Sequence, residues 1–298
     1  MYKMKNNYNN FFKTSDNEQI FYTTNFPPGT VSKDVLVFNY GLVCSNYHWG
    51  SQIEFFDRLG YYILLHDYRG HYSSSGADDI AKISLTQITE DMDELFSFLE
   101  LESMILLGHS LGVNICLEYA KTHQEKIKQM ILISGTIIPI YNIMMDTHLT
   151  GVLEPVFQSL ITNFSKPFRL FWKYGGWSPL FRKGIGEGGF NMNQVSDEFI
   201  ETYLNKLSQL GPELFIQLLN QMHRHDILAF IDQIKIPSLI IGGNIDKVIP
   251  NFNQKLLHSK LEDSELYTVH AGSHVPQVDF INATNERIKI FLESTQPT

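Results

Sequence analysis

One stretch of the chain, residues 104–121, reads MILLGHSLGVNICLEYAK. It opens with four apolar residues, Met104–Leu107, and a short apolar run that stops at a glycine is typical of a fully buried strand. Val113–Lys121 has the composition of a helix. The join between them, Gly108-His109-Ser110-Leu111-Gly112, fits the pattern G-x-S-x-G, in which a serine occupies a sharp strand-to-helix turn that exposes its hydroxyl above a sheet. The stretch therefore predicts a nucleophilic Ser110 on a sheet of an α/β protein.

The rest of the chain alternates short apolar runs with stretches of helical spacing. The further runs are Val35–Phe38, Tyr61–Leu65, Met130–Ile133, Ser238–Ile241 and Leu266–Val269. Among the intervening stretches, Ile88 to Leu99 places its apolar residues on one face of a helix and acidic residues on the other. Strands that alternate with helices predict right-handed crossovers and a mostly parallel sheet with helices on both faces.

The alternation stops from about Pro139 to Ile231, where no clear buried strand is found. The interval is rich in aromatic residues, which include Phe157, Phe164, Phe168, Phe171, Trp172 and Trp177. Its glycine cluster, residues 184–189, lacks the preceding strand and the GKS or GKT ending of a phosphate loop, so it is interpreted as a flexible hinge. We therefore predict an α/β core over residues 1–136, a helical cap insertion over 137–232, and the rest of the core over 233–298.

A serine becomes a strong nucleophile only when a base takes its proton and a carboxylate orients that base. On this type of sheet the acid and the base follow the serine in the chain, each in a loop at the carboxyl end of a later strand. Asp246 follows the run Ser238–Ile241, and His274 follows Leu266–Val269. The sequence thus predicts Ser110, Asp246 and His274 as the catalytic residues.

Each partner of the serine has a rival. Asp226 offers a carboxylate, but it begins an apolar stretch and is expected to cap a helix. His270 offers an imidazole, but it ends a strand, whereas His274 lies in a loop that can reach Ser110. Gly135-Thr136, after an earlier strand, offers no carboxylate, which favours Asp246.

With these residues the sequence resembles the α/β-hydrolase superfamily, specifically its capped lipase, esterase and monoacylglycerol-lipase-like branches. Tyr40-Gly41-Leu42 through Trp49 resembles the oxyanion loop of that family. Asp67 through Gly76 resembles its D-x-R-G-x-G-x-S segment, and Asp226 to Asp246 resembles the stretch that ends in P-x-L-x-x-x-G-x-x-D. The resemblance implies an α/β-hydrolase fold with an inserted helical cap.

The resemblance also implies an oxyanion hole made by the backbone N–H groups of Leu42 and Leu111. The chain departs from the family pattern at Tyr40, where His is usual, at Tyr72, where Gly is common, and at Val113, where Gly or Ala usually follows. Because an oxyanion hole uses backbone N–H groups, a change of side chain at Tyr40 need not abolish it. Haloalkane dehalogenases and epoxide hydrolases need an Asp at the elbow, and dienelactone hydrolases a Cys, so Ser110 argues against all three.

Composition narrows the partners and the location. With 32 acidic and 23 basic residues the formal net charge is −9, which disfavours nucleic acid and anionic membrane surfaces. The longest apolar stretch, Met130–Ile140, falls far short of the ~18–20 residues that a membrane span needs. Two cysteines, Cys44 and Cys116, cannot form a disulfide framework, so a cytoplasmic location is expected. Both are interpreted as buried structural residues.

No cofactor and no metal is expected. The histidines of His223-Arg224-His225-Asp226 diverge on a helix and have no further ligand at a suitable spacing. The predicted function is hydrolysis of a carboxylic ester with an apolar acyl, aryl or lactone group through an acyl-enzyme. Two alternatives stay open: a C–C bond hydrolase of the meta-cleavage type, and a catalytically silent receptor for a small molecule. The oligomeric state is not predicted.

Overall fold

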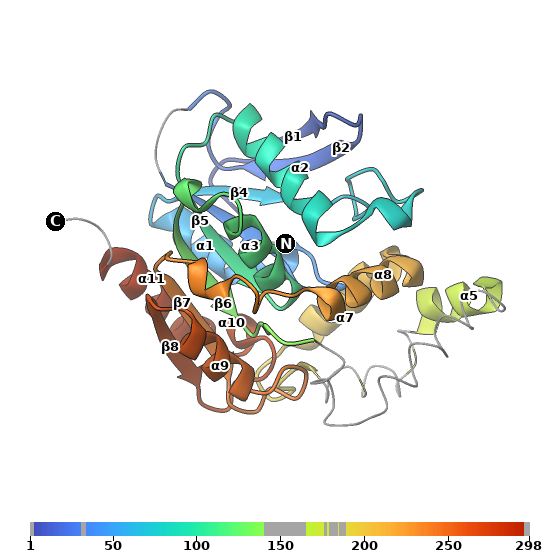
Figure 1. Ribbon diagram of the computed structural model, residues 1–298. Coiled ribbons are helices and arrows are strands. Elements are labelled where there is room, and N and C mark those ends of the chain that lie inside the picture. Colours follow the sequence, from blue (N-terminus) through green and yellow to red (C-terminus); the bar gives the residue numbers. More distant parts are fainter. Residues whose placement is uncertain are drawn as a thin grey trace.

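The computed structural model describes residues 3–30, 34–139, 165–175, 178, 184 and 189–294, which build one twisted sheet with helices on both faces (Figure 1). The strands stand in the order β1-β2-β4-β3-β5-β6-β7-β8. Their bounds are β1 Tyr8–Lys13, β2 Gln19–Thr24, β3 Val35–Asn39, β4 Tyr62–His66, β5 Met104–His109, β6 Ile127–Ile133, β7 Ser238–Gly243 and β8 Ser264–Val269. The six apolar runs of the sequence coincide with the six strands from β3 to β8, so those predictions are confirmed.

From β4 to β8 every neighbouring pair is parallel, and the antiparallel pairs are β1 with β2 and β2 with β4. The strands β3 and β5 are buried along their whole length, as expected for parallel strands that helices cover on both faces. In their register Asn39 lies opposite Gly108. The loops that follow β3 and β5 therefore leave the sheet side by side, at the edge where the candidate serine lies.

The strands β1 and β2 were missed by the sequence pattern. The side chains of β1 are mostly exposed, so it has no apolar run to reveal it. It is instead held by pairing with β2, from Tyr8 opposite Thr24 to Lys13 opposite Gln19. This is a tertiary effect that local composition does not show.

The helices of the core divide between the two faces of the sheet (Figure 1). They are α1 Gly50–Arg58, α2 Leu85–Phe98, α3 Leu111–Ala120, α9 Phe252–Lys260, α10 Pro276–Asp279 and α11 Ile281–Ser294. Right-handed crossovers place α1 on one face, and α2, α3 and α9 on the other, because the chain moves across the sheet in opposite directions. The contacts agree, since α1 packs against α11 and α2 packs against α3.

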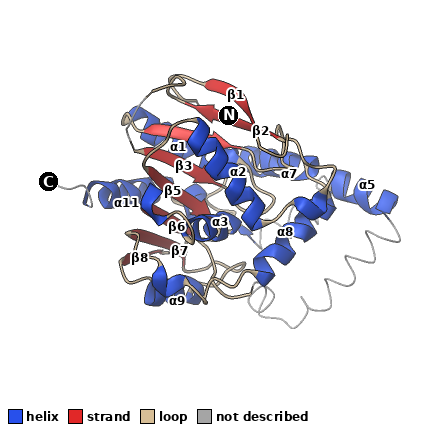
Figure 2. Ribbon diagram, turned by 45° about the horizontal axis from the view of Figure 1, so that its top comes forward, coloured by secondary structure: helices blue, strands red, loops and turns tan. Residues whose placement is uncertain are grey.

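Within residues 137–232 the described helices of three turns or more are α5 Ser165–Gly175, α7 Asp197–Gln209 and α8 Pro212–Arg224 (Figure 2). Helix α7 lies over the loops that follow β3 and β4, because Phe199 stacks on Tyr47 and Lys206 lies over the ring of Tyr72. Of the residues discussed from the sequence, Phe157, Phe164, Trp177 and glycines 186 and 188 lie outside the described residues. The division into core and cap stays a prediction.

Among the described helices, none combines the length and the apolar character that crossing a bilayer requires.

Candidate active site

The loop between β5 and α3 holds Ser110 in a strained conformation. Its φ is +53° and its ψ is −115°, a backbone region that residues with a side chain rarely adopt and that costs ~1–3 kcal/mol. Two backbone bonds fix it: Ser110 N donates to Ile133 O at 2.9 Å, and Val113 N donates to Ser110 O at 2.9 Å. The sharp turn between strand and helix that the motif predicts is therefore present.

The two glycines of the motif allow the chain to turn this sharply. A Cβ atom on Gly108 would lie 2.5 Å from the carbonyl oxygen of Gly112. A Cβ on Gly112 would lie 2.1 Å from the carbonyl oxygen of Asn39, at the end of β3. Both contacts are with backbone, which cannot turn aside, so a side chain at either position would displace the helix from the sheet.

The structure brings Asp246 and His274 together. His274 Nδ1 and Asp246 Oδ2 are 2.9 Å apart, and the other carboxylate oxygen accepts backbone N–H bonds from Val248 and Ile249 at 2.8 and 2.9 Å. An ionised carboxylate can only accept, so the proton of the neutral imidazole lies on Nδ1. The Nε2 atom of His274 is then left with a lone pair, which is the form that a general base requires.

A close backbone contact joins the loops that carry these two residues. A Cβ on Gly243, at the end of β7, would lie 2.1 Å from the carbonyl oxygen of Gly272 and 2.2 Å from that of Ser273. Only glycine allows the two loops to approach so closely. The distance between Asp246 and His274 is therefore set by the backbone as well as by the side chains.

His109, at the turn between β5 and α3, contacts the loop that carries His274 (the histidine loop), and sequence reasoning missed this contact. Its Nε2–H donates to the carbonyl oxygen of His274 at 2.9 Å, and the two rings lie 5.0 Å apart. Burial holds the pKa of His109 well below its ordinary value, so the ring stays neutral and keeps one donor for this bond. Because His109 directly precedes Ser110, the bond places the loop of His274 beside the serine. The signal available in the sequence was the histidine inside the motif.

The loop after β3 lies directly against the elbow. A Cβ on Gly41 would lie 3.0 Å from Cβ of Ser110 and 2.9 Å from Nδ1 of His109. Leu42 follows in this loop, and Leu111 is the first residue of α3, a position whose N–H has no acceptor inside the helix. The two predicted oxyanion donors thus come from segments that meet at Ser110.

Tyr40 and Tyr72, which depart from the family pattern, both form hydrogen bonds through their hydroxyl groups. The Tyr40 hydroxyl accepts from Tyr68 N at 2.9 Å, and the Tyr68 hydroxyl donates to Tyr40 O at 3.0 Å. Tyr72 has a φ of +43°, which explains why glycine suits this position. Its hydroxyl donates to Cys44 O at 2.6 Å, a bond that offsets part of the strain. Both tyrosines therefore tie the loop after β3 to the loop after β4.

Val113, which departs from the family pattern, faces a glycine. A Cβ on Gly135, two residues after β6, would lie 2.5 Å from Cβ of Val113 and 2.4 Å from its Cγ1. The valine of α3 therefore occupies the space that a side chain at Gly135 would need. Sequence reasoning treated the two positions separately and missed this pairing.

The segment that begins at Asp67 contains two buried charges with different surroundings. Burial raises the pKa of Asp67 to about 6, although its carboxylate accepts from Ser73 N at 3.2 Å. Arg69 is 1% exposed and bonds to Asp91 at 2.9 and 2.5 Å and to Asp16 at 2.6 and 3.1 Å. Its hydrogen bonds hold the pKa of Asp16 well below the ordinary value. Arg69 thus anchors this loop to the N-terminal hairpin.

The rivals of the predicted residues lie elsewhere. Asp226 is exposed in the loop after α8, where it does not cap a helix, so that expectation was wrong. His270 is exposed directly after the end of β8. His225 bonds through Nε2 to Glu118 and accepts at Nδ1 from Asn114, both at 3.0 Å. Within the described part of the chain, no three His, Cys, Asp or Glu side chains gather as a metal site needs.

Both cysteines are buried, as the sequence suggested. Burial raises the pKa of the Cys44 thiol to about 12, and it raises that of Cys116 as well. A thiol reacts as its thiolate, so neither is a nucleophile at neutral pH.

The model of the family described as alpha/beta hydrolase fold matches residues 34–280. The match covers most of the chain, including the elbow, the loop after β3 and both loops of the Asp246–His274 pair. The chain belongs to this family, as the resemblance of its motifs indicated.

Individual relatives are distant. The chain is 24% identical over 264 residues to the human Protein ABHD8, a match that covers 89% of the chain and 56% of the human protein. The chain thus spans little more than half the length of that relative. It is 23% identical to the bifunctional esterase/perhydrolase DCH of Acinetobacter calcoaceticus, covering 80% of the chain and 83% of that protein. The esterase EaEST of Exiguobacterium antarcticum superposes with a TM-score of 0.78 at 20% identity, over 96% of the chain and all of the esterase.

Proposed function

We propose that this protein is a serine hydrolase that cleaves carboxylic esters through an acyl-enzyme, with Ser110 as nucleophile, His274 as base and Asp246 as acid partner. The observation that carries the proposal is the 2.9 Å pair of His274 and Asp246, whose histidine loop is bonded to the residue before Ser110. A strained, glycine-flanked serine and a histidine–carboxylate pair are the groups that acyl transfer requires.

The reaction has two halves. His274 Nε2 takes the proton of Ser110 as its oxygen attacks the ester carbonyl, and the N–H groups of Leu42 and Leu111 bind the oxyanion that forms. The protonated histidine then gives its proton to the departing alcohol, which leaves an acyl-serine. Water attacks that acyl group, again with His274 as base, and releases the carboxylic acid. Asp246 keeps the proton of the ring on Nδ1 and stabilises the charged imidazole.

The proposed substrates are esters with an apolar acyl, aryl or lactone group. Aromatic residues of α7 lie over the loop after β3, where Phe199 and Tyr203 pack edge-on against His48. Such surroundings favour an apolar substrate. An alkoxide leaves more readily than an amide nitrogen, which makes an ester the first choice. The name of the Acinetobacter relative, an esterase/perhydrolase, points in the same direction.

The first test is Ser110→Ala, assayed with p-nitrophenyl esters of several acyl lengths. We expect a loss of at least ~10³-fold in kcat/KM, because removal of the nucleophile leaves only binding and the oxyanion hole. A fluorophosphonate probe should label Ser110 in the unaltered protein, as mass mapping would show. Ser97→Ala, at an exposed position of α2, is the matched control and should retain full activity.

The outcomes separate the alternative functions. Turnover of dienones in place of esters would assign the same residues to a C–C bond hydrolase. A serine that the probe does not label would indicate a silent receptor. Asp246→Asn should reduce kcat by ~10⁴-fold through the wrong tautomer of His274, whereas Asp226→Asn, at the rival position, should leave it unchanged. Equal losses in both variants would contradict the assignment of Asp246.

A further inference from the structure

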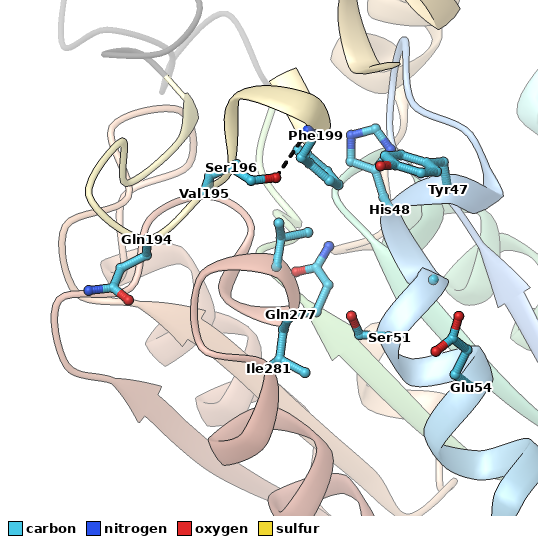
Figure 3. Close-up of a pocket in the computed structure, with 12 residues that line it drawn as sticks. Tyr47, His48, Ser51, Glu54, Gln194, Val195, Ser196, Phe199, Gln277 and Ile281 are labelled. Atoms are coloured by element: carbon cyan, nitrogen blue, oxygen red, sulfur yellow. Dashed lines mark hydrogen bonds between the residues drawn. The ribbon is translucent and has the colours of Figure 1, made fainter. Parts of the chain in front are cut away.

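The structure has a cavity of about 330 Å³ that none of the proposed catalytic residues lines (Figure 3). Three distant segments form its wall: residues 47–54, residues 194–199 at the start of α7, and residues 277–281 of α10 and α11. The first segment includes the 3₁₀ helix η1, Asn46–Trp49, and the start of α1. The cavity is thus formed where α7 meets the core.

Gln277 gives this cavity an unsatisfied polar group. Its residue is 0% exposed, and among the described residues neither Oε1 nor Nε2 of its amide has a hydrogen-bond partner. Its backbone carbonyl, in contrast, accepts from Gln52 Nε2 at 2.9 Å. Figure 3 shows the amide directed toward the space that Ser51, His48 and Phe199 surround. A buried polar group without a partner is destabilising, so Gln277 gains from a ligand that bonds to it.

The charge of the cavity restricts that ligand. Among the described residues of the wall, Glu54 is the only acidic one, and there is no Lys or Arg. Burial lowers the pKa of His48 to about 4, so this histidine adds no positive charge at neutral pH. Ser51 and Glu54 lie three residues apart on α1 and therefore share one side of the helix. The wall offers a carboxylate, a hydroxyl and an amide, and it repels anions.

We propose that this cavity is a second ligand site, for a small molecule that carries a hydroxyl and an amine group and no negative charge. The amine bonds to the Glu54 carboxylate and the hydroxyl to the Gln277 amide. Because the last torsion of a glutamine side chain has a broad minimum, the amide can turn either its donor or its acceptor to the hydroxyl. The site does not depend on the proposed hydrolase function.

The cavity lies against the segment that follows His274, the proposed base. Helix α10, which supplies Gln277, begins at Pro276, two residues after His274. A ligand in the cavity therefore contacts the segment that continues the histidine loop. It also contacts Val195 and Phe199, and so joins α7 to the core.

The test measures binding of ethanolamine and 3-amino-1,2-propanediol to the full chain by saturation-transfer difference NMR, with glycolate as the anionic probe. Both amines should give signals that saturate at millimolar concentration, as expected for ligands of so few atoms, and glycolate should give none. Gln277→Leu should weaken binding by ~10-fold, the value of about one hydrogen bond. Gln209→Leu, at an exposed position of α7, is the matched control and should bind as the unaltered protein does.

A second pair of variants covers the case in which Gln277→Leu does not fold. Glu54→Gln should weaken binding of both amines several-fold, and Glu90→Gln, exposed on α2, should not. If Gln277→Leu folds, its melting temperature without ligand should not fall, because the amide it loses has no partner. The proposal is overturned if no amine binds, if glycolate binds equally well, or if the cavity variants and their controls bind alike. Labelling of Ser110 by the fluorophosphonate probe is read separately, so failure of either proposal is distinguishable from failure of the other.

Discussion

The carboxyl edge of the sheet and the covering segment, residues 189–209 with α7, differ in how closely their backbones are packed. At the edge, Gly112 and Gly243 each touch backbone so closely that an added Cβ would lie 2.1 Å from a carbonyl oxygen. In the covering segment, a Cβ on Gly189 would meet none of the described residues within 4 Å, and α7 contacts the core through pairs such as Lys206 and Tyr72. At these positions the edge accepts only glycine, close to the proposed catalytic residues, whereas Gly189 of the covering segment has space for a larger side chain.

Among the variants that test this comparison, Gly112→Ala has the largest expected effect. The new Cβ would force α3 away from Asn39 O and displace Ser110 with it. A displacement of ~1 Å at the reacting atoms costs ~100-fold in rate, and overpacking of this kind costs ~3 kcal/mol or more in the free energy of unfolding. Ester hydrolysis and urea denaturation measure the two effects.

Gly189→Ala is the counterpart in the covering segment. It should change kcat by less than ~2-fold and the free energy of unfolding by less than ~0.5 kcal/mol, as surface substitutions usually do. Comparable losses in the two variants would break the distinction between edge and covering segment.

A smaller effect is expected where Val113 of α3 faces Gly135, two residues after β6. Gly135→Ala alone should destabilise the fold by ~2–3 kcal/mol, because the new methyl collides with the valine. With Val113→Gly in the same chain the collision is absent, so the double variant should be no less stable than Val113→Gly alone. Urea denaturation of the four proteins gives the coupling. Simple additivity of the two changes would show that the contact is not shared.

A further, smaller effect concerns Asp67, which lies at the contact between edge and covering segment and is influenced by Lys206 of α7. Its pKa rises from 3.8 to about 6 in the folded protein, so ionising it opposes folding. That opposition is absent below the ordinary pKa and complete once the pH exceeds about 6. Asp67→Asn should therefore raise stability by ~1–2 kcal/mol near pH 7.5 and change it little near pH 4.

Thermal unfolding at the two pH values checks this prediction. The amide oxygen that Asp67→Asn introduces would still accept the bond from Ser73 N, so the loop should keep its shape. Lys206→Met is the control on the covering side, because it removes the charge that attracts the carboxylate. Asp67→Asn stabilising equally at both pH values would contradict burial of the charge as the cause.

Apolar runs in the sequence predicted the buried strands of the sheet. The strands β3 to β7 are buried along nearly all of their length, so each is a short run of large apolar residues bounded by turns. The hairpin of β1 and β2 carries no such run, because β1 is exposed and depends on its partner. The register in which β1 pairs with β2, with Asn10 opposite Tyr22, cannot be deduced from composition.

For the candidate site, chain order was the strongest guide. It pointed to Asp246 and His274, which the structure places 2.9 Å apart; their catalytic roles stay a prediction. The contacts that sequence reasoning missed are those between segments far apart in the chain: His109 with the carbonyl of His274, and Gly135 with Val113. Such pairs become visible only when strands are stacked in their order in the sheet.

The strand order has a consequence for how this family diversifies. Strands β6 and β7 are neighbours, with Met130 opposite Ser238, and Ser134 N donates to Ile241 O directly after β6 ends. Because the two strands are parallel, the connection leaves β6 at the carboxyl edge of the sheet and enters the neighbouring β7 from the opposite edge, and lengthening such a connection adds little closure entropy, ~0.6 kcal/mol per doubling. A lineage can therefore change the length of this connection at little cost in free energy, while the register of β6 with β7 stays as it is.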